Sequence, residues 1–195
     1  MGNLRNVRRA CEEAGAPARI SSSPDAVAGA DALILPGVGA FGEAVRRIDE
    51  VGLRVPILAH VNAGKPLLGI CLGMQLLFDA SEESPGARGL GVLGGSVRRL
   101  GDGVKIPHIG WNDVIPSVAN PLVQESAVYY FVHSFAAEVV PETVALTGYG
   151  GEFSAAVRKG NVYGVQFHPE KSQSAGLALL RRFAALPGSA PGREP

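Results

Sequence analysis

The chain has 195 residues, of which 46% are hydrophobic and 18% are charged, so it can bury a core and is not of the disordered class. Its 18 basic residues balance its 18 acidic ones, which leaves no electrostatic argument for a nucleic-acid or membrane-surface partner. There is no apolar run of bilayer-spanning length, no signal-peptide pattern, and no disulfide or zinc pattern in the two cysteines. We therefore expect a cytoplasmic protein with no metal and no cofactor.

The first half of the chain alternates between predicted helices and short apolar strands. Helical spacing predicts a helix at the N-terminus, and the apolar runs at residues 31–37 and 66–70 predict buried strands. Each strand precedes a predicted helix, over residues 40–52 and 72–80, and residues 55–64 predict another helix. This alternation predicts a three-layer α/β fold, in which helices flank a largely parallel sheet.

The C-terminal half is rich in short β-strands. After about residue 90, alternating apolar segments are joined by Gly, Pro and Asn turns, and Lys159-Gly160-Asn161 predicts a hairpin. A last helix is predicted over residues 174–186. We expect residues 1–187 to form a single domain and residues 188–195 to form a flexible tail.

A cysteine with a glycine two positions away on each side lies between a predicted strand and a predicted helix. In the segment 69–73, "GICLG", the turn is too tight for side chains at the glycines, as in a nucleophile elbow. The N-terminus of the following helix favours a thiolate at Cys71, and backbone N–H groups after Cys71 can face an oxyanion. The same pentapeptide fits a loop with a buried thiol equally well.

A thiol nucleophile needs a base, and His168 is the strongest candidate. It ends an apolar strand in "GVQFHPEKS", and Glu170 lies on the same side of an extended chain, where a carboxylate can orient an imidazole. Taken alone, the segment fits a polar surface turn better. His60 and His108 are weaker candidates, whereas His133 could line the same pocket, and the histidines lack metal-ligand spacing.

A glycine-rich turn follows the first predicted strand. The segment "LPGVGAFG" (35–42) lets backbone N–H groups approach a ligand closely, which suits an oxyanion hole, a phosphate cradle or a tight strand–helix turn. No lysine follows at the P-loop position, which argues against a nucleotide site.

Four segments together resemble the triad (class I) glutamine amidotransferases in their order and approximate spacing. They are "LPGVGAFG", "GICLGMQLLF", "YYFVHSF" and "GVQFHPEKS". Two further features, "CLGMQ" and "KIPHIGWN" (105–112), resemble one branch of that family. This branch contains the glutaminase subunits of imidazole glycerol phosphate synthase, from L-histidine biosynthesis.

The resemblance implies the chemistry of a glutaminase with a Cys-His-Glu triad. Cys71 would attack the side-chain amide of L-glutamine, and His168, oriented by Glu170, would move the protons. A glutamyl thioester would form and be hydrolysed to glutamate, with release of ammonia. The resemblance also implies roles for other residues: Gly37, Val38 and Leu72 in the oxyanion hole, Gln75, His133 and Ser134 in substrate binding, and Tyr130 and Lys171 at the partner interface.

The resemblance further implies a heterodimer with a (βα)8-barrel cyclase subunit. In this family the ammonia passes to the cyclase, which converts the ribulosyl phosphate PRFAR into imidazole glycerol phosphate and the carboxamide ribotide AICAR. The glutaminase would be activated when the cyclase holds its ligand. We expect Gly37 to act in this switch, because glycine allows a peptide to rotate.

The N-terminus departs from the family pattern. Family members open with a β-strand that ends in an Asp-Tyr-Gly-x-Gly-Asn-like segment, and this sequence begins inside it, at "MGNLR". We therefore expect the first strand of the family to be absent and two strand edges to be exposed. We also expect that the natural chain starts earlier than this sequence.

Three other functions remain open from the sequence. The glutaminase of anthranilate or aminodeoxychorismate synthase is one, although "CLGMQ" and "KIPHIGWN" weigh against it. A non-catalytic scaffold on the same fold is another, against which the complete set of Cys71, His168 and Glu170 argues. The third is a cysteine peptidase on a related α/β fold, which would hydrolyse peptides without a partner.

Overall fold

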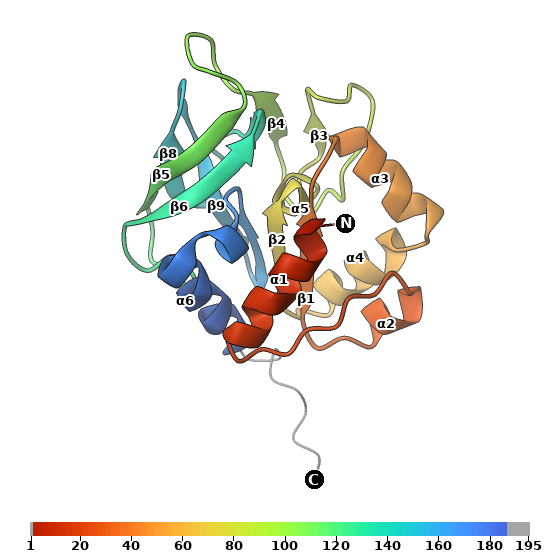
Figure 1. Ribbon diagram of the computed structural model, residues 1–195. Helices are drawn as coiled ribbons and strands as arrows, with labels where there is room; N and C mark the ends of the chain where they lie inside the picture. The colour runs from red at the N-terminus through yellow and green to blue at the C-terminus, as the bar shows by residue number, and fades with distance from the viewer. Residues whose placement is uncertain (1, 187–195) are drawn as a thin grey trace.

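The computed structural model describes residues 2–186, with side chains from residue 4, and the predicted tail lies outside this range. The helices are α1 (Gly2–Glu13), α2 (Pro24–Ala28), α3 (Phe41–Glu50), α4 (Arg54–Asn62), α5 (Leu72–Gln75) and α6 (Gln173–Ala184), with a 3-10 turn η1 (Pro169–Lys171). The strands are β1 (Leu33–Gly37), β2 (Leu67–Cys71), β3 (Ala80–Ser81), β4 (Ser96–Arg99), β5 (His108–Pro116), β6 (Ala127–His133), β7 (Phe135–Ala137), β8 (Thr143–Gly148), β9 (Glu152–Lys159) and β10 (Val162–Val165). Figure 1 shows their arrangement.

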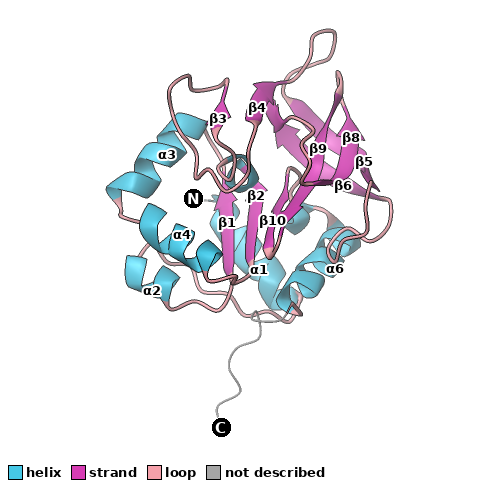
Figure 2. Ribbon diagram, turned by 180° about the vertical axis from the view of Figure 1, so that it is seen from behind, coloured by secondary structure: helices cyan, strands magenta, loops and turns pink. Residues whose placement is uncertain are grey.

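Helices cover both faces of the part of the sheet that contains β1, β2 and β10 (Figure 2). Successive residues of a strand point to opposite faces, so Leu68 and Ile70 pack in the same core cluster as α1 and α6. Leu67 packs in a second cluster with residues of α2 and α4. The predicted α/β fold with flanking helical layers is therefore confirmed.

The large sheet is mixed rather than largely parallel. Its order is β1-β2-β10-β9-β8-β5-β6, and parallel pairing is confined to β1 with β2 and β2 with β10. The predicted hairpin at Lys159-Gly160-Asn161 is confirmed: β9 and β10 are antiparallel, and Gly160 has a φ of +59°. The β-rich half thus joins the same sheet through antiparallel pairing, which needs no crossover helix. The three strands β3, β4 and β7 form a separate small sheet.

Strand β1 lies at one edge of the large sheet, with β2 as its neighbour. All five residues of β1 are partly exposed, whereas all five of β2 are buried. Among residues 2–186, no strand precedes α1, and residues 16–23 between α1 and α2 form no strand either. We expected two exposed strand edges where the first family strand is absent. Within the described residues, one of these edges is present, at β1.

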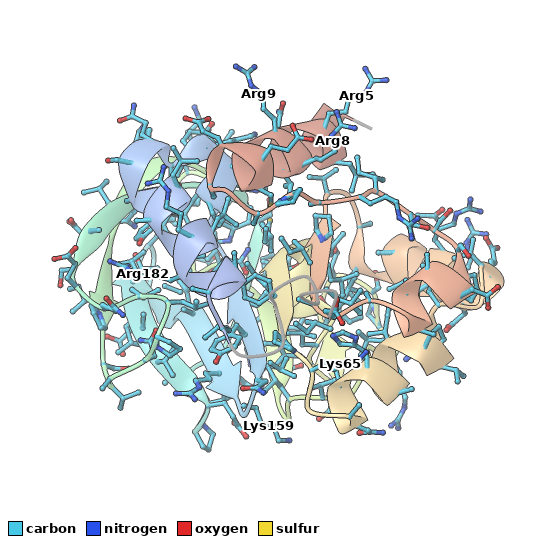
Figure 3. All side chains as sticks on the ribbon, turned by 90° about the horizontal axis from the view of Figure 1, so that it is seen from below. Arg5, Arg8, Arg9, Lys65, Lys159 and Arg182 are labelled. Carbon is cyan, nitrogen blue, oxygen red and sulfur yellow. The ribbon has the colours of Figure 1, made fainter. Side chains whose placement is uncertain are left out.

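Helix α1 is amphipathic. Its exposed face carries Arg5, Arg8 and Arg9, of which Arg5 and Arg9 point away from the body of the molecule (Figure 3). The opposite face buries Val7, Ala10 and Cys11 in the core. None of the helices within residues 2–186 combines the length and the apolar character needed to cross a membrane.

Candidate active site

Cys71 occupies a strained turn between β2 and α5. Its φ of +53° and ψ of −110° lie in a region that side-chain-bearing residues rarely adopt. A Cβ added to Gly73 would lie 1.7 Å from the carbonyl oxygen of Leu35, and one added to Gly69 would lie 2.7 Å from that of Gly73. The two glycines are therefore required by close backbone contacts, as in a nucleophile elbow.

His168 and Glu170 form a buried pair, and His168 interacts with Cys71. His168 Nδ1 lies 2.8 Å from Glu170 Oε1, and both side chains are buried. Burial lowers the pKa of His168, but its interactions with Cys71 and Glu170 outweigh that effect and raise the pKa to about 9. Nε2 of His168 is buried with no hydrogen-bond partner of ordinary geometry, which leaves this nitrogen available to Cys71.

Ser172 holds the chain around His168, a role that the sequence analysis missed. Its Oγ donates to the carbonyl oxygen of His168 at 2.7 Å and accepts from the N–H of Tyr130 at 3.0 Å. The N–H of His168 donates in turn to the carbonyl oxygen of Tyr130 at 2.9 Å. These bonds tie the turn that carries the predicted base to β6.

The predicted oxyanion-hole residues lie beside Cys71. Gly37 is the register partner of Cys71 in the parallel pair of β1 and β2, and Leu72 opens α5, where backbone N–H groups lack partners inside the helix. A Cβ on Gly37 would lie 3.0 Å from Leu72 Cβ, so Gly37 is needed for close packing. The left-handed φ in this loop is at Gly39, +106°, rather than at Gly37, and the intervening Val38 is exposed.

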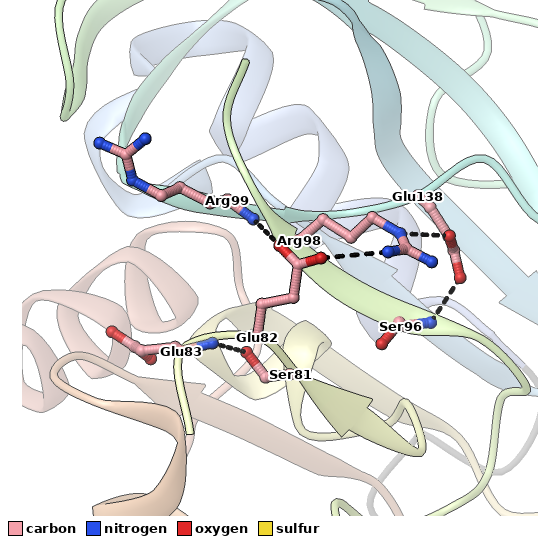
Figure 4. A network of polar contacts seen from close by, with 7 residues as sticks. All are labelled: Ser81, Glu82, Glu83, Ser96, Arg98, Arg99 and Glu138. Atoms are coloured by element: carbon pink, nitrogen blue, oxygen red, sulfur yellow. Dashed lines mark hydrogen bonds and ion pairs between the residues drawn. The ribbon is translucent and has the colours of Figure 1, made fainter. Parts of the chain in front are cut away.

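A distant segment caps the helix that follows this loop. Ala40 offers no side-chain cap to α3; instead, Glu83 Oε2 accepts from the N–H of Phe41 at 2.7 Å and Ser84 Oγ from the N–H of Gly42 at 2.9 Å. Figure 4 shows the neighbouring network in which Glu82 binds Arg98 and the Arg99 N–H, while Arg98 also binds Glu138. The candidate oxyanion loop is thus anchored by β2 on one side and by residues 83 and 84 on the other.

Two glutamine side chains connect Cys71 to β7. Gln75 Nε2 donates to the carbonyl oxygen of Phe135 at 2.8 Å and to Gln166 Oε1 at 3.0 Å. Gln166 Nε2 lies 3.7 Å from Cys71 Sγ. The structure therefore places Gln75, a predicted substrate residue, in an internal network. It also adds Gln166, whose one sequence signal is its place two residues before His168.

His133, another predicted substrate residue, is buried in a neutral pair of histidines. Its Nδ1 lies 2.9 Å from the carbonyl oxygen of Phe135, and its Nε2 lies 3.1 Å from His108 Nδ1. The carbonyl requires a proton on Nδ1 of His133, so Nε2 accepts from His108. Burial lowers the pKa of His133 to about 3, with smaller contributions of the same sign from His108 and His168.

The remaining predicted residues lie next to these groups. Ser134 is half-buried, and its carbonyl oxygen accepts the N–H of Leu100 at 3.0 Å. Tyr130 is half-buried, Lys171 is exposed, and the Lys171 ammonium lies 5.4 Å from the centre of the Tyr130 ring. The two predicted interface residues therefore form one surface feature, adjacent to His168.

Known proteins resemble this chain over nearly its whole length. The family model described as "Glutamine amidotransferase class-I" matches residues 2–185. A relative from Rhodopirellula baltica, named "Imidazole glycerol phosphate synthase subunit HisH", is 51% identical over 193 residues, covering 96% of this chain and 94% of its own. The subunit of the same name from Methanothermobacter thermautotrophicus is 46% identical over 188 residues, with 95% and 94% covered.

Solved structures share the fold. One titled "Crystal structure of glutamine amidotransferase" has a TM-score of 0.75 at 25% identity and covers 94% of this chain and 93% of its own. The glutaminase domain of Trypanosoma brucei CTPS with bound acivicin, at 18% identity, has a TM-score of 0.68 over 93% and 87% of the two chains and supports the fold alone. The chain belongs to the class I glutamine amidotransferase family, in the same branch as its HisH relatives.

Proposed function

We propose that the chain is the glutaminase subunit of imidazole glycerol phosphate synthase. It hydrolyses L-glutamine to glutamate and ammonia, and it supplies the ammonia to a cyclase that forms imidazole glycerol phosphate and AICAR from PRFAR in L-histidine biosynthesis. The two relatives named HisH described above, at 51% and 46% identity, support this assignment.

One observation carries the proposed mechanism: a strained cysteine faces a histidine whose other nitrogen is held by a buried carboxylate. With a pKa of about 9, His168 is an imidazolium at neutral pH, which favours the thiolate of Cys71 beside it. The thiolate attacks the amide carbon of glutamine, and His168 gives its proton to the departing ammonia. His168 then takes a proton from the water that hydrolyses the thioester, while Glu170 keeps the ring oriented.

The negative charge of the tetrahedral intermediate needs backbone donors close to the sulfur. We assign this role to the N–H of Leu72 and to the Gly37–Val38 peptide, whose strand register places it next to Cys71. Gln75, His133 and Ser134 are assigned to glutamine binding. Gln75 and His133 each contact the carbonyl oxygen of Phe135 in the structure. When glutamine binds, each side chain either keeps this contact or exchanges it for one to the substrate.

An exposed apolar face supports the partner assignment. Ile109, Trp111 and Ile115 lie on one face of β5 and are 47–57% exposed, with the exposed Asp113 between Trp111 and Ile115. The ring of Trp111 contacts that of Tyr130, which Lys171 also approaches. Several exposed apolar side chains on one strand face are typical of protein–protein contacts. We assign the face to the (βα)8-barrel cyclase subunit, because it adjoins the turn that carries His168 and so brings the ammonia source near the partner.

The test measures glutamate release with the cyclase subunit and its ligand present and absent. We expect Cys71→Ala to abolish glutamate release, whereas Cys11→Ala, the matched substitution of the other cysteine, should retain it. Retained activity in Cys71→Ala would exclude the proposed nucleophile. Co-purification with a chorismate enzyme rather than the cyclase would instead assign the chain to another amidotransferase branch, and peptide hydrolysis without a partner would identify a peptidase.

A further inference from the structure

The carbonyl oxygen of Phe135 determines which group donates and which accepts in the side-chain hydrogen bonds of Gln166. The carbonyl oxygen of Phe135 can only accept, so the atom of Gln75 that lies 2.8 Å from it must be the amide nitrogen. The same nitrogen lies 3.0 Å from the side chain of Gln166, which must therefore turn its oxygen toward Gln75. The amide nitrogen of Gln166 is left on the other side, 3.7 Å from Cys71 Sγ.

Gln166 is fully buried and approaches Cys71 from the same segment as the proposed base. It is 0% exposed and lies in the bend that follows β10, two residues before His168, and both side chains interact with Cys71. The titratable groups that interact with Cys71 are His168 and Glu170, through His168, and these two in turn affect the pKa values of His133 in β6 and Cys11 in α1. Gln166 adds a neutral donor of fixed direction to these groups.

We propose that Gln166 is a positioning residue for the nucleophile: its amide donates to Cys71 Sγ, and Gln75 and the Phe135 carbonyl fix the direction of that donor. The inference rests on the proposed role of Cys71. A hydrogen bond to an anionic sulfur is stronger than one to a thiol, so the contact favours the thiolate. The hydrogen bond from Gln166 stabilises the thiolate before it attacks glutamine. It stabilises the thiolate again after water has added to the thioester, when the C–S bond breaks and the electron pair returns to sulfur.

The test follows alkylation of Cys71 by iodoacetamide against pH in the full chain. Gln166→Met removes the donor at similar volume, and Gln166→Glu keeps the shape but turns an acceptor oxygen toward the sulfur. We expect the pH of half-maximal alkylation to rise by about one unit in Gln166→Met, a tenfold lower thiolate fraction below that pH, and by more in Gln166→Glu. Peptide mass mapping separates Cys71 from Cys11, whose burial raises its pKa to about 11.

Two controls separate this role from a general effect on folding. Thr147→Val replaces another buried side chain, whose Oγ1 has no hydrogen-bond partner, and should keep the natural alkylation profile. In the complex with the cyclase, Gln166→Met should lower kcat for glutamine about tenfold with little change in KM. Unchanged alkylation profiles in both folded Gln166 variants would overturn the proposal. If alkylation of Cys71 in the natural chain spares glutaminase activity, the proposed nucleophile fails instead.

A second measurement keeps the natural glutamine, because substitution of a fully buried side chain can prevent folding. In ¹H–¹⁵N NMR spectra of the full chain, the side-chain amide protons of Gln166 should shift with pH as Cys71 ionises. The shift should disappear in Cys71→Ala. An identical pH response of these protons in the two proteins would contradict the contact.

Discussion

Two buried histidines close to the nucleophile are in opposite states. His168, next to Glu170, has its pKa raised to about 9, whereas His133, next to His108, has its pKa lowered to about 3. Burial lowers both values and is the largest single cause in each case. The difference lies in the partners: a carboxylate and a thiol face one ring, and a neutral ring and a carbonyl oxygen face the other.

The comparison explains how one small region can hold a proton donor and a neutral hydrogen-bonding group. Both rings are fixed by a bond through Nδ1, to Glu170 in one case and to the Phe135 carbonyl in the other. A charged partner at this position keeps a second proton on the ring, and a neutral partner does not. Burial thus lowers the pKa of both rings, and only at His168 do neighbouring groups, Cys71 and Glu170, outweigh it.

Removal of the carboxylate should make His168 resemble His133, and among the exchanges that test this comparison it should have the largest effect on activity. In Glu170→Gln, we expect kcat for glutamine in the cyclase complex to fall by about 10⁴-fold, as when a triad loses its orienting carboxylate. The imidazolium of the natural protein is lost as pH rises through about 9, so the alkaline limb of activity should lie there. The limb should move to lower pH in the variant.

The matched control for Glu170→Gln is Glu152→Gln, which neutralises an exposed carboxylate of β9. It should leave both kcat and the alkaline limb unchanged. A Glu170→Gln enzyme with the natural alkaline limb would show that the carboxylate does not hold the proton on His168.

The reverse exchange should make His133 resemble His168. His108→Asp places a carboxylate oxygen near the position of His108 Nδ1, 3.1 Å from His133 Nε2. We expect the pKa of His133, followed by NMR of its ring protons, to rise by at least about 2 units. His108→Asn has the same shape without the charge and should leave His133 neutral at pH 6. Equal titration of His133 in the two variants would contradict the role given to the partner's charge.

The neutral state of His133 should also appear in the stability of the protein at acid pH. The unfolded chain binds a proton at His133 below a pKa of about 6.5, and the folded chain does so only near 3. Stability is thus lost as pH falls from about 6.5 toward 3, and this one group accounts for about 2 kcal/mol between pH 8 and pH 5. Denaturant unfolding should show a free energy that depends less on pH in His133→Gln by that amount. Parallel curves for the two proteins would refute it.

Local signals in the sequence predicted the turn that carries Cys71. The glycines at 69 and 73 indicated an elbow because a tight turn excludes side chains, and both positions prove to lie against main-chain atoms. The helix expected over residues 72–80 ends at Gln75, however. Instead, the carbonyl oxygen of Leu76 accepts the N–H of residue 90, and that of Leu77 accepts the N–H groups of residues 92 and 93. Hydrogen bonds between segments this far apart do not change the spacing of apolar residues, so the sequence pattern could not predict where the helix ends.

Local sequence patterns also predicted only some of the polar contacts around the nucleophile. The spacing of His168 and Glu170 indicated a shared side of an extended chain, and the structure brings them within 2.8 Å, but through the 3-10 turn η1 rather than an extended segment. The contact between His108 and His133 depends on the register of β5 against β6, which places them opposite each other. Strand register and sheet order come from tertiary packing, so neither this pair nor the mixed sheet could be derived from local patterns.

The carbonyl oxygen of Phe135 places an unusual restriction on engineering of this enzyme. It belongs to the main chain, so any residue type at position 135 supplies the same acceptor, and no side-chain exchange there removes it. Positions 75 and 166 are therefore coupled, because the donor of one side chain meets the acceptor of the other. A change at one position needs a matching change at the other to keep the hydrogen-bond network. Libraries that vary these two positions one at a time will contain mismatched pairs. Joint randomisation is the route to alternative networks around the cysteine.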